Sequence, residues 1–115
     1  MFESFVASEI IKAQVSRGGS PELFYFRDQQ GLEVDFLVPL PRGRLGLLEV
    51  KWSKTPAPKH AAPLKALLAS VSQPTLPIVI HRPGRTLNDE PKPLGGSVQA
   101  LTVDRFIHDF THGLL

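Results

Sequence analysis

The chain has 115 residues, no cysteine, and 13 Lys and Arg against 11 Asp and Glu, which gives a formal charge of +2. This length fits a single domain over residues 1–115, and the lack of cysteine excludes disulfides, thiolate metal sites and cysteine nucleophiles. We find no apolar run long enough to span a membrane and no secretory signal, so we expect a cytoplasmic protein with no membrane partner. The small net charge does not by itself establish nucleic-acid binding.

The first half of the chain predicts one helix followed by a meander of strands. Apolar residues recur at helical spacing over residues 2–17, and Gly18 and Gly19 indicate where that helix ends. Runs of apolar and aromatic residues predict strands at 23–27, 32–38 and 45–52. A turn at 28–31 and a loop at 39–43 are expected to connect these strands.

The second half predicts alternating helices and strands. The expected elements are a helix at 63–71, a strand at 78–81, a strand at 98–103 and a helix at 104–115. Residues 82–96 hold several Pro and Gly residues and predict a long surface loop. The resulting order, α-β-β-β-α-β-β-α, indicates an α/β domain with a mixed central sheet flanked by helices.

Glu49 and Lys51 are charged residues within an apolar strand. Side chains two residues apart in a strand point to the same face, so this acid and this base are expected to project together. Asp35 adds a carboxylate in the preceding strand, and buried charges must be paired or bound to a metal. Asp on one strand and Glu-x-Lys on the next is the arrangement of metal-dependent nucleases that cut phosphodiesters. The alternative is a pair of carboxylates on a water-facing side of the sheet, with Lys51 as a simple salt-bridge partner.

Four stretches of the chain resemble a known family, namely FESFVASEI at 2–10, FYFRD at 24–28, GLEVDFL at 31–37 and LEVK at 48–51. They resemble the PD-(D/E)XK, or restriction-endonuclease-like, nuclease superfamily. They are closer still to the domain of unknown function found at the C-terminus of bacterial and archaeal AAA+ ATPases. The resemblance covers most of residues 1–55 and implies a restriction-endonuclease-like α-β-β-β-α-β core. The chain has no G-x-x-x-x-G-K-[ST] motif, so it looks like a detached C-terminal module without its ATPase portion.

The resemblance also implies an activity, a nuclease-type domain that hydrolyses phosphodiester bonds in DNA with a metal-activated water. Its implied catalytic residues are Asp35, Glu49 and Lys51. Asp35 and Glu49 would hold Mg²⁺ or Mn²⁺, with Glu3 and the Val50 backbone carbonyl as further ligands. Lys51 would position the water or stabilise negative charge that develops on the phosphate.

Other interpretations stay open at this stage. Glu3 is also favourable in the first turn of a helix whatever its function, and Glu9 would replace it as a ligand in a different helix register. The alternative function is a catalytically inactive accessory or interaction module of an AAA+ ATPase that retains the nuclease fold. Such a module should expose an apolar patch around Phe2, Phe5 and Val6, and this patch would also allow homo-oligomers to form.

The sequence also contains three weaker signals. The basic residues around the third strand could guide a phosphate backbone or could be ordinary loop charges, and they are Arg42, Arg44, Lys51, Lys54 and Lys59. His108 and His112 share a helix face, but without a third ligand a solvent-facing stripe is favoured over a zinc site. Trp52 is expected to pack in the core or at an edge, with stacking on a nucleobase as the alternative.

Overall fold

The computed structural model describes residues 2–84 and 89–115. In these residues the helices are α1 (Phe2–Ser16), α2 (Ala62–Leu68) and α3 (Val103–Thr111). The strands are β1 (Phe24–Arg27), β2 (Glu33–Leu40), β3 (Arg44–Lys51), β4 (Thr75–His81), β5 (Lys92–Pro93) and β6 (Gln99–Thr102). Short 3₁₀ turns at Pro41–Gly43 and Pro58–Ala61 precede β3 and α2. None of the helices in the described ranges is long and apolar enough to cross a bilayer.

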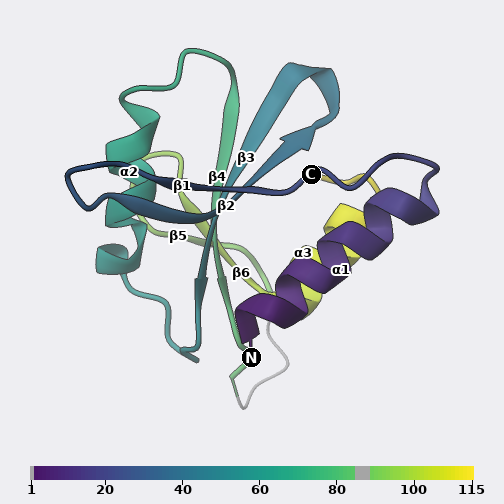
Figure 1. The fold of residues 1–115 in the computed structure, drawn as a ribbon. Coiled ribbons are helices and arrows are strands. Elements are labelled where there is room, and N and C mark those ends of the chain that lie inside the picture. The colour runs from purple at the N-terminus through teal and green to yellow at the C-terminus, as the bar shows by residue number, and fades with distance from the viewer. Residues whose placement is uncertain (1, 85–88) are drawn as a thin grey trace.

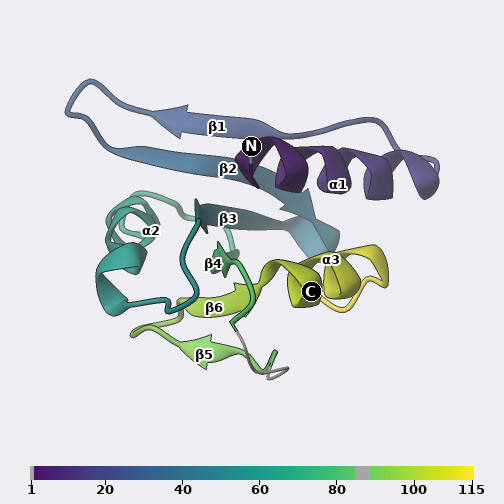
Figure 2. The same cartoon turned by 90° about the horizontal axis from the view of Figure 1, so that it is seen from below.

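The strands form one sheet of six in the order β1-β2-β3-β4-β6-β5. Strands β1, β2 and β3 pair antiparallel, β3, β4 and β6 pair parallel, and β5 returns antiparallel to β6. Figure 2 shows this order as a stack of strands from β1 to β5. The described part of the chain is therefore a mixed α/β domain with an open, mixed sheet.

Helices cover both faces of this sheet. Helices α1 and α3 lie on one face and α2 lies on the other (Figure 1). In β3, Leu48 and Val50 pack towards α1 and α3, whereas Leu47 packs towards α2. Ile80 and Val79 of β4 alternate in the same way. These central strands are apolar on both faces because both faces are covered, as is typical of parallel strands.

Strand β2 contains a β-bulge next to the carboxylate at position 35. The register between β1 and β2 shifts by one residue, so that Tyr25 faces both Asp35 and Phe36. Val34 consequently packs with the α2 cluster and Phe36 with the α1 cluster, although they lie two residues apart. A bulge bends its strand and re-aims a side chain, and here it does so at Asp35.

Most of the predicted elements are confirmed. The first helix was predicted at 2–17 and ends at Ser16, and the three predicted strands of the meander correspond to β1, β2 and β3. The sheet is mixed and helices flank it, as the predicted order of elements required. Differences of one to three residues at strand ends are ordinary for boundaries read from sequence.

The second half differs from its prediction in several places. The loop predicted at 82–96 contains strand β5. This strand consists of Lys92 and Pro93 alone, which is too short to leave a periodic pattern in the sequence. Residues 85–88 of the predicted loop lie outside the described residues. Strand β4 begins at Thr75, three residues earlier than expected, and includes Pro77. Proline is tolerated there because Pro77 precedes the first pair between β4 and β6, where its missing N–H breaks no ladder bond.

The two shorter helices also end earlier than predicted. Helix α2 ends at Leu68 rather than at 71, and α3 ends at Thr111 rather than continuing to 115. In α3 the reason is Gly113, whose φ of 68° is left-handed, and the Leu114 N–H donates back to the Asp109 carbonyl at 2.8 Å. This is the Schellman arrangement that terminates helices.

Gly46 of β3 is expected to be required for the close contact between β2 and β3. A Cβ added there would lie 2.8 Å from Val38 Cγ1 and 3.3 Å from the Val38 backbone oxygen, inside the core. We expect Gly46→Ala to lower the free energy of unfolding by about 1–3 kcal/mol in urea denaturation. Gly84→Ala is the matched control, because no heavy atom lies within 4 Å of its added Cβ. Equal stability of the two variants would contradict this packing.

Candidate functional site

Strands β2 and β3 separate at the point where the predicted site residues lie. Their last shared pair is Phe36 with Leu48, and both strands continue beyond it without further pairing to each other. Asp35 and Glu49 are the next residues on the two strands, directly beside the bulge. We call this place, defined by Asp35 and Glu49, the strand fork.

Each carboxylate of the strand fork binds the backbone of the other strand. The Val50 N–H donates to Asp35 Oδ2 at 2.7 Å. The Asp35 N–H donates to Glu49 Oε1 at 3.4 Å. The two side chains therefore replace the backbone ladder where the strands separate, and this fixes the position of both carboxylates.

Lys51 accompanies Glu49, as the alternation of a strand predicted. Its Nζ lies 3.7 Å from Glu49 Oε2. Glu49 is only 4% exposed, whereas the side chain of Lys51 is 40% exposed. The interpretation of Glu49 as a surface-facing carboxylate is therefore wrong, because its side chain is almost completely buried. The long stem of Lys51 lets its ammonium group remain in contact with water.

Burial and charge act together on Glu49. Burial raises its pKa, and the negative charge of Asp35 and a hydrogen bond to the Asp35 carboxyl raise it further, while Lys51 partly opposes them, so that the pKa is about 7. Two carboxylates held this close cannot both be ionised without a free-energy cost. The strand fork thus holds an acid that titrates near neutral pH and a second negative group beside it, an arrangement that a bound cation would stabilise.

Glu3 stands at the start of α1, in the vicinity of the strand fork. Burial and the charge of Asp35 raise the pKa of Glu3, and Lys51 acts in the opposite direction. Across residues 2–84 and 89–115, no group of three or more His, Cys, Asp or Glu side chains is placed to hold a metal ion. The carboxylates that bond within the fork are thus Asp35 and Glu49, with Glu3 acting on them through charge. Glu9 forms an ion pair with Lys12 at 3.1 Å.

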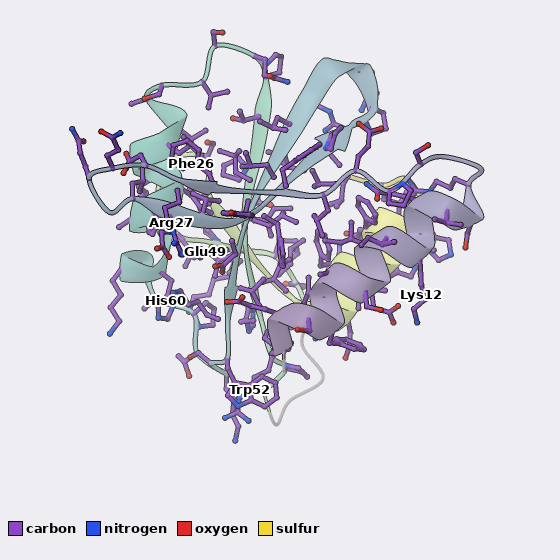
Figure 3. The ribbon with its side chains drawn as sticks, in the orientation of Figure 1. Lys12, Phe26, Arg27, Glu49, Trp52 and His60 are labelled. Carbon is purple, nitrogen blue, oxygen red and sulfur yellow. The ribbon has the colours of Figure 1, made fainter. Side chains whose placement is uncertain are left out.

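A hollow lies beside the strand fork, between α1 and the end of β3. It has a volume of about 820 Å³ and is lined by Phe2, Glu3, Ser4, Val50 and Trp52. We call it the N-terminal hollow. Val50 joins it to the strand fork, because its N–H holds Asp35 and the residue itself lines the hollow. Figure 3 shows Glu49 partway along the sheet and Trp52 near the start of α1.

The basic residues around β3 do not form a single rim. Arg42 and Arg44 lie at the opposite end of β3 from Lys51, which favours the interpretation of these two residues as ordinary loop charges. Arg44 serves a structural purpose, since its guanidinium donates to the carbonyls of Pro41 and Leu115. The two ends of a strand of this length are about 20 Å or more apart. The five basic residues fall within 18 positions of the sequence, so their closeness along the chain did not reveal this separation.

His60 lies within the electrostatic influence of Lys51, although the sequence contained no signal for it. Burial and the positive charges of Lys51 and Lys59 lower the pKa of His60. Its Nδ1 accepts a hydrogen bond from the Ala57 N–H at 3.1 Å, which orients the ring. Lys54 follows β3 and lines a separate hollow of about 410 Å³. Lys51 and Lys59 are thus the cations that act on His60, whereas Arg42 and Arg44 lie at the other end of β3.

The histidines of α3 take part in a local polar network. Asp109 accepts from Arg105 Nε at 2.9 Å and lies 3.0 Å from His108 Nδ1. His108 and His112 are both exposed, which agrees with the solvent-facing stripe that was favoured over a zinc site.

The apolar patch expected at the start of α1 is small. Val6 is buried, Phe2 is half-buried and only Phe5 is extensively exposed, at 48%. Larger exposure occurs on the edge strand β1, where Phe24 is 55% and Tyr25 is 73% exposed. Exposed apolar surface therefore occurs on the sheet edge as well as on α1, where Val15 is also exposed.

The fold and the strand fork together define a mixed α/β domain with a charged site where two central strands separate. Residues 1–103 match the model of the family described as Domain of unknown function (DUF4143), and the chain belongs to this family. No curated protein and no solved structure matches the chain. The match confirms the part of the resemblance that pointed to a domain of unknown function. The resemblance to PD-(D/E)XK nucleases stays a prediction.

Glu49 is expected to make stability fall as the pH rises. Its folded-state pKa of about 7 lies above the ordinary value of 4.5, so the folded state binds more protons in this window and loses stability as the proton is released. We therefore expect the free energy of unfolding of Glu49→Gln, relative to that of the wild type, to rise by roughly 2 kcal/mol as the pH increases from about 4.5 to about 8. Urea denaturation at a series of pH values measures this difference.

The comparison with wild type cancels the contribution of the histidines. Burial lowers the pKa of His60 and of His81, so these residues change stability with the opposite sign. Glu33→Gln is the matched control, since Glu33 is an exposed acid paired with Arg27 at 2.9 Å. A difference between Glu49→Gln and wild type that is constant with pH would show that the folded state does not raise the pKa of Glu49.

Proposed function

We propose that the protein is a metal-dependent nuclease-type domain of PD-(D/E)XK architecture that hydrolyses phosphodiester bonds in DNA. The observation that carries this proposal is the strand fork itself, in which Asp35 and Glu49 are hydrogen-bonded together and Lys51 Nζ lies 3.7 Å from Glu49. The element order α1-β1-β2-β3-α2-β4 supports it, because it is the order expected of a restriction-endonuclease-like core.

The donor atoms of the strand fork suit Mg²⁺ or Mn²⁺. Carboxylate oxygens of Asp35 and Glu49 and the carbonyl of Val50 are the hard ligands that these ions take, with water completing the shell. Each carboxylate uses one oxygen for a backbone N–H and retains lone pairs for a further ligand. Burial first and then the negative charge of Asp35 raise the pKa of Glu49, and a divalent cation would stabilise the ionised form of this carboxyl. Glu3 would add negative charge from the N-terminal hollow.

The residues of the site have separable tasks. When bound, the ion would neutralise charge on the phosphate and acidify the attacking water. Asp35 and Glu49 would hold the ion, and their backbone hydrogen bonds would keep them in place. Lys51 would donate hydrogen bonds to the phosphate oxygens as negative charge increases on them, since its ammonium is partly exposed next to Glu49.

Titration calorimetry with Mg²⁺ and with Mn²⁺ tests the metal site directly. We expect saturable binding to the wild type and none to the variant that combines Asp35→Asn with Glu49→Gln, because both carboxylate ligands are then neutral. Glu9→Gln is the matched control, since Glu9 is an acid on α1 that pairs with Lys12. Lack of binding by wild-type protein that is folded by circular dichroism would contradict the proposal.

Cleavage tests the role of Lys51 separately from metal binding. We expect the wild type to nick supercoiled plasmid DNA with Mg²⁺ or Mn²⁺, and Lys51→Met to cut about 10²–10³-fold more slowly with metal binding retained. Lys59→Met is the control, because Lys59 is a neighbouring cation without contact to Glu49. Equal cleavage rates for Lys51→Met and the wild type would remove Lys51 from the catalytic set.

A second candidate function is an inactive interaction module of an AAA+ ATPase. It is favoured by the exposure of Phe24 and Tyr25 on β1, an edge strand with one side left unpaired in the described sheet. This module would bind its ATPase partner or a second copy of the chain through that edge. It predicts loss of the complex in a variant with Phe24→Ser and Tyr25→Ser, and no effect of Asp35→Asn.

A further inference from the structure

Trp52 is the chain's single tryptophan, and it stands at the end of the proposed catalytic strand. It directly follows Lys51 and lines the N-terminal hollow. Its side chain is 66% exposed, although it touches the ring of Phe2 edge-on with ring centroids 5.0 Å apart. Much of this large ring is therefore accessible to a ligand that can stack on it.

Arg82 joins Trp52 through the register of the parallel strands. Lys51 of β3 pairs with His81 of β4, so the residues that follow them, Trp52 and Arg82, leave the sheet side by side. The guanidinium carbon of Arg82 lies 4.9 Å from the centre of the Trp52 ring. Its Nε is buried without a hydrogen-bond partner among the described residues. The pair thus offers an aromatic surface together with a cation that has donors to spare.

From this geometry we infer that Trp52 and Arg82 bind an unpaired nucleotide of the substrate, with the base stacked on Trp52 and a phosphate oxygen accepting from Arg82. The inference rests on the proposed function and names its substrate as single-stranded DNA, or a single-stranded end or flap. A base within a duplex is stacked and paired on all sides, so it cannot lie against a protein ring unless it is unstacked. The ring is large enough for any base, so little sequence preference is expected.

The position of this pair relative to the strand fork supports the inference. The Cα atoms of Lys51 and Trp52 are about 3.8 Å apart, as in any trans peptide. Alternation sends Glu49 and Lys51 to one side of β3 and Val50 to the other, where Trp52 meets Phe2 of α1. A strand that crosses the end of β3 would therefore place a phosphate near Lys51 and an adjacent base near Trp52.

The single tryptophan makes binding measurable without catalysis. In EDTA, we expect an oligo-dT of about 12 nucleotides to quench the emission of Trp52 and to protect it from acrylamide, and a blunt duplex of equal length to do neither. Anisotropy of the labelled oligonucleotide should show that Trp52→Ala weakens binding about tenfold or more, while Trp52→Phe retains most of it. Leu114→Ala is the control, because Leu114 is also exposed, at 64%, but lies beside Arg44 at the opposite end of β3 from Lys51.

The outcomes separate this inference from the nuclease proposal. Single-strand binding by wild type and by Glu49→Gln, with no cleavage by either, would retain the inference and overturn the nuclease. Cleavage that Trp52→Ala leaves unchanged would overturn the inference and retain the nuclease. Unaltered Trp52 emission with single strands, or equal affinity for duplex, would also overturn it. Arg82→Gln should weaken binding and reduce its dependence on salt, and a salt dependence equal to that of wild type would remove Arg82 from the site.

Discussion

The hydrogen bond from the Val50 N–H to Asp35 is the interaction on which the site depends. Val50 lies in a strand that is paired with β4 on its other side, and it is almost completely buried. Where β2 leaves β3, this N–H would lose its partner, and a buried unsatisfied donor costs about 1–3 kcal/mol. The Asp35 carboxylate, 2.7 Å away, removes this cost and permits the strands to separate. The strand fork therefore exists because a side chain replaces a backbone acceptor.

This arrangement gives Asp35 a structural task in addition to the proposed chemical one. A residue without an acceptor at this position would leave the Val50 N–H unsatisfied, so a loss of activity could then reflect a damaged sheet. Asparagine retains an acceptor oxygen and removes only the charge. The same reasoning applies to Glu49, which accepts from the Asp35 N–H and which glutamine can replace as an acceptor. Changes of charge at constant shape are therefore the informative substitutions in the strand fork.

The sequence predicts the part of the site that depends on a period of two residues. Glu49 and Lys51 were expected on one face of a strand, and the 3.7 Å separation between their charged groups confirms it. Position 35 was not predictable in this way, because the bulge in β2 reverses the alternation there and no residue type marks it. The sequence left the grouping of Arg42 and Arg44 with Lys51 open for a related reason, since closeness along the chain does not show how far apart the two ends of an extended strand lie.

Arg82 shows a different limit of sequence reasoning. Thirty positions separate it from Trp52, and the residues around it predicted only a loop. The two meet because β3 and β4 are parallel and in a register that pairs Lys51 with His81, so residues that end two different strands emerge together. Parallel strands bring their carboxyl ends to one edge of a sheet, which is where Lys51, Trp52 and Arg82 of this protein lie. That edge offers a carboxylate pair and a lysine on one side of β3 and an aromatic ring with a cation on the other, and a flexible nucleic-acid strand is a ligand able to contact both sides at once.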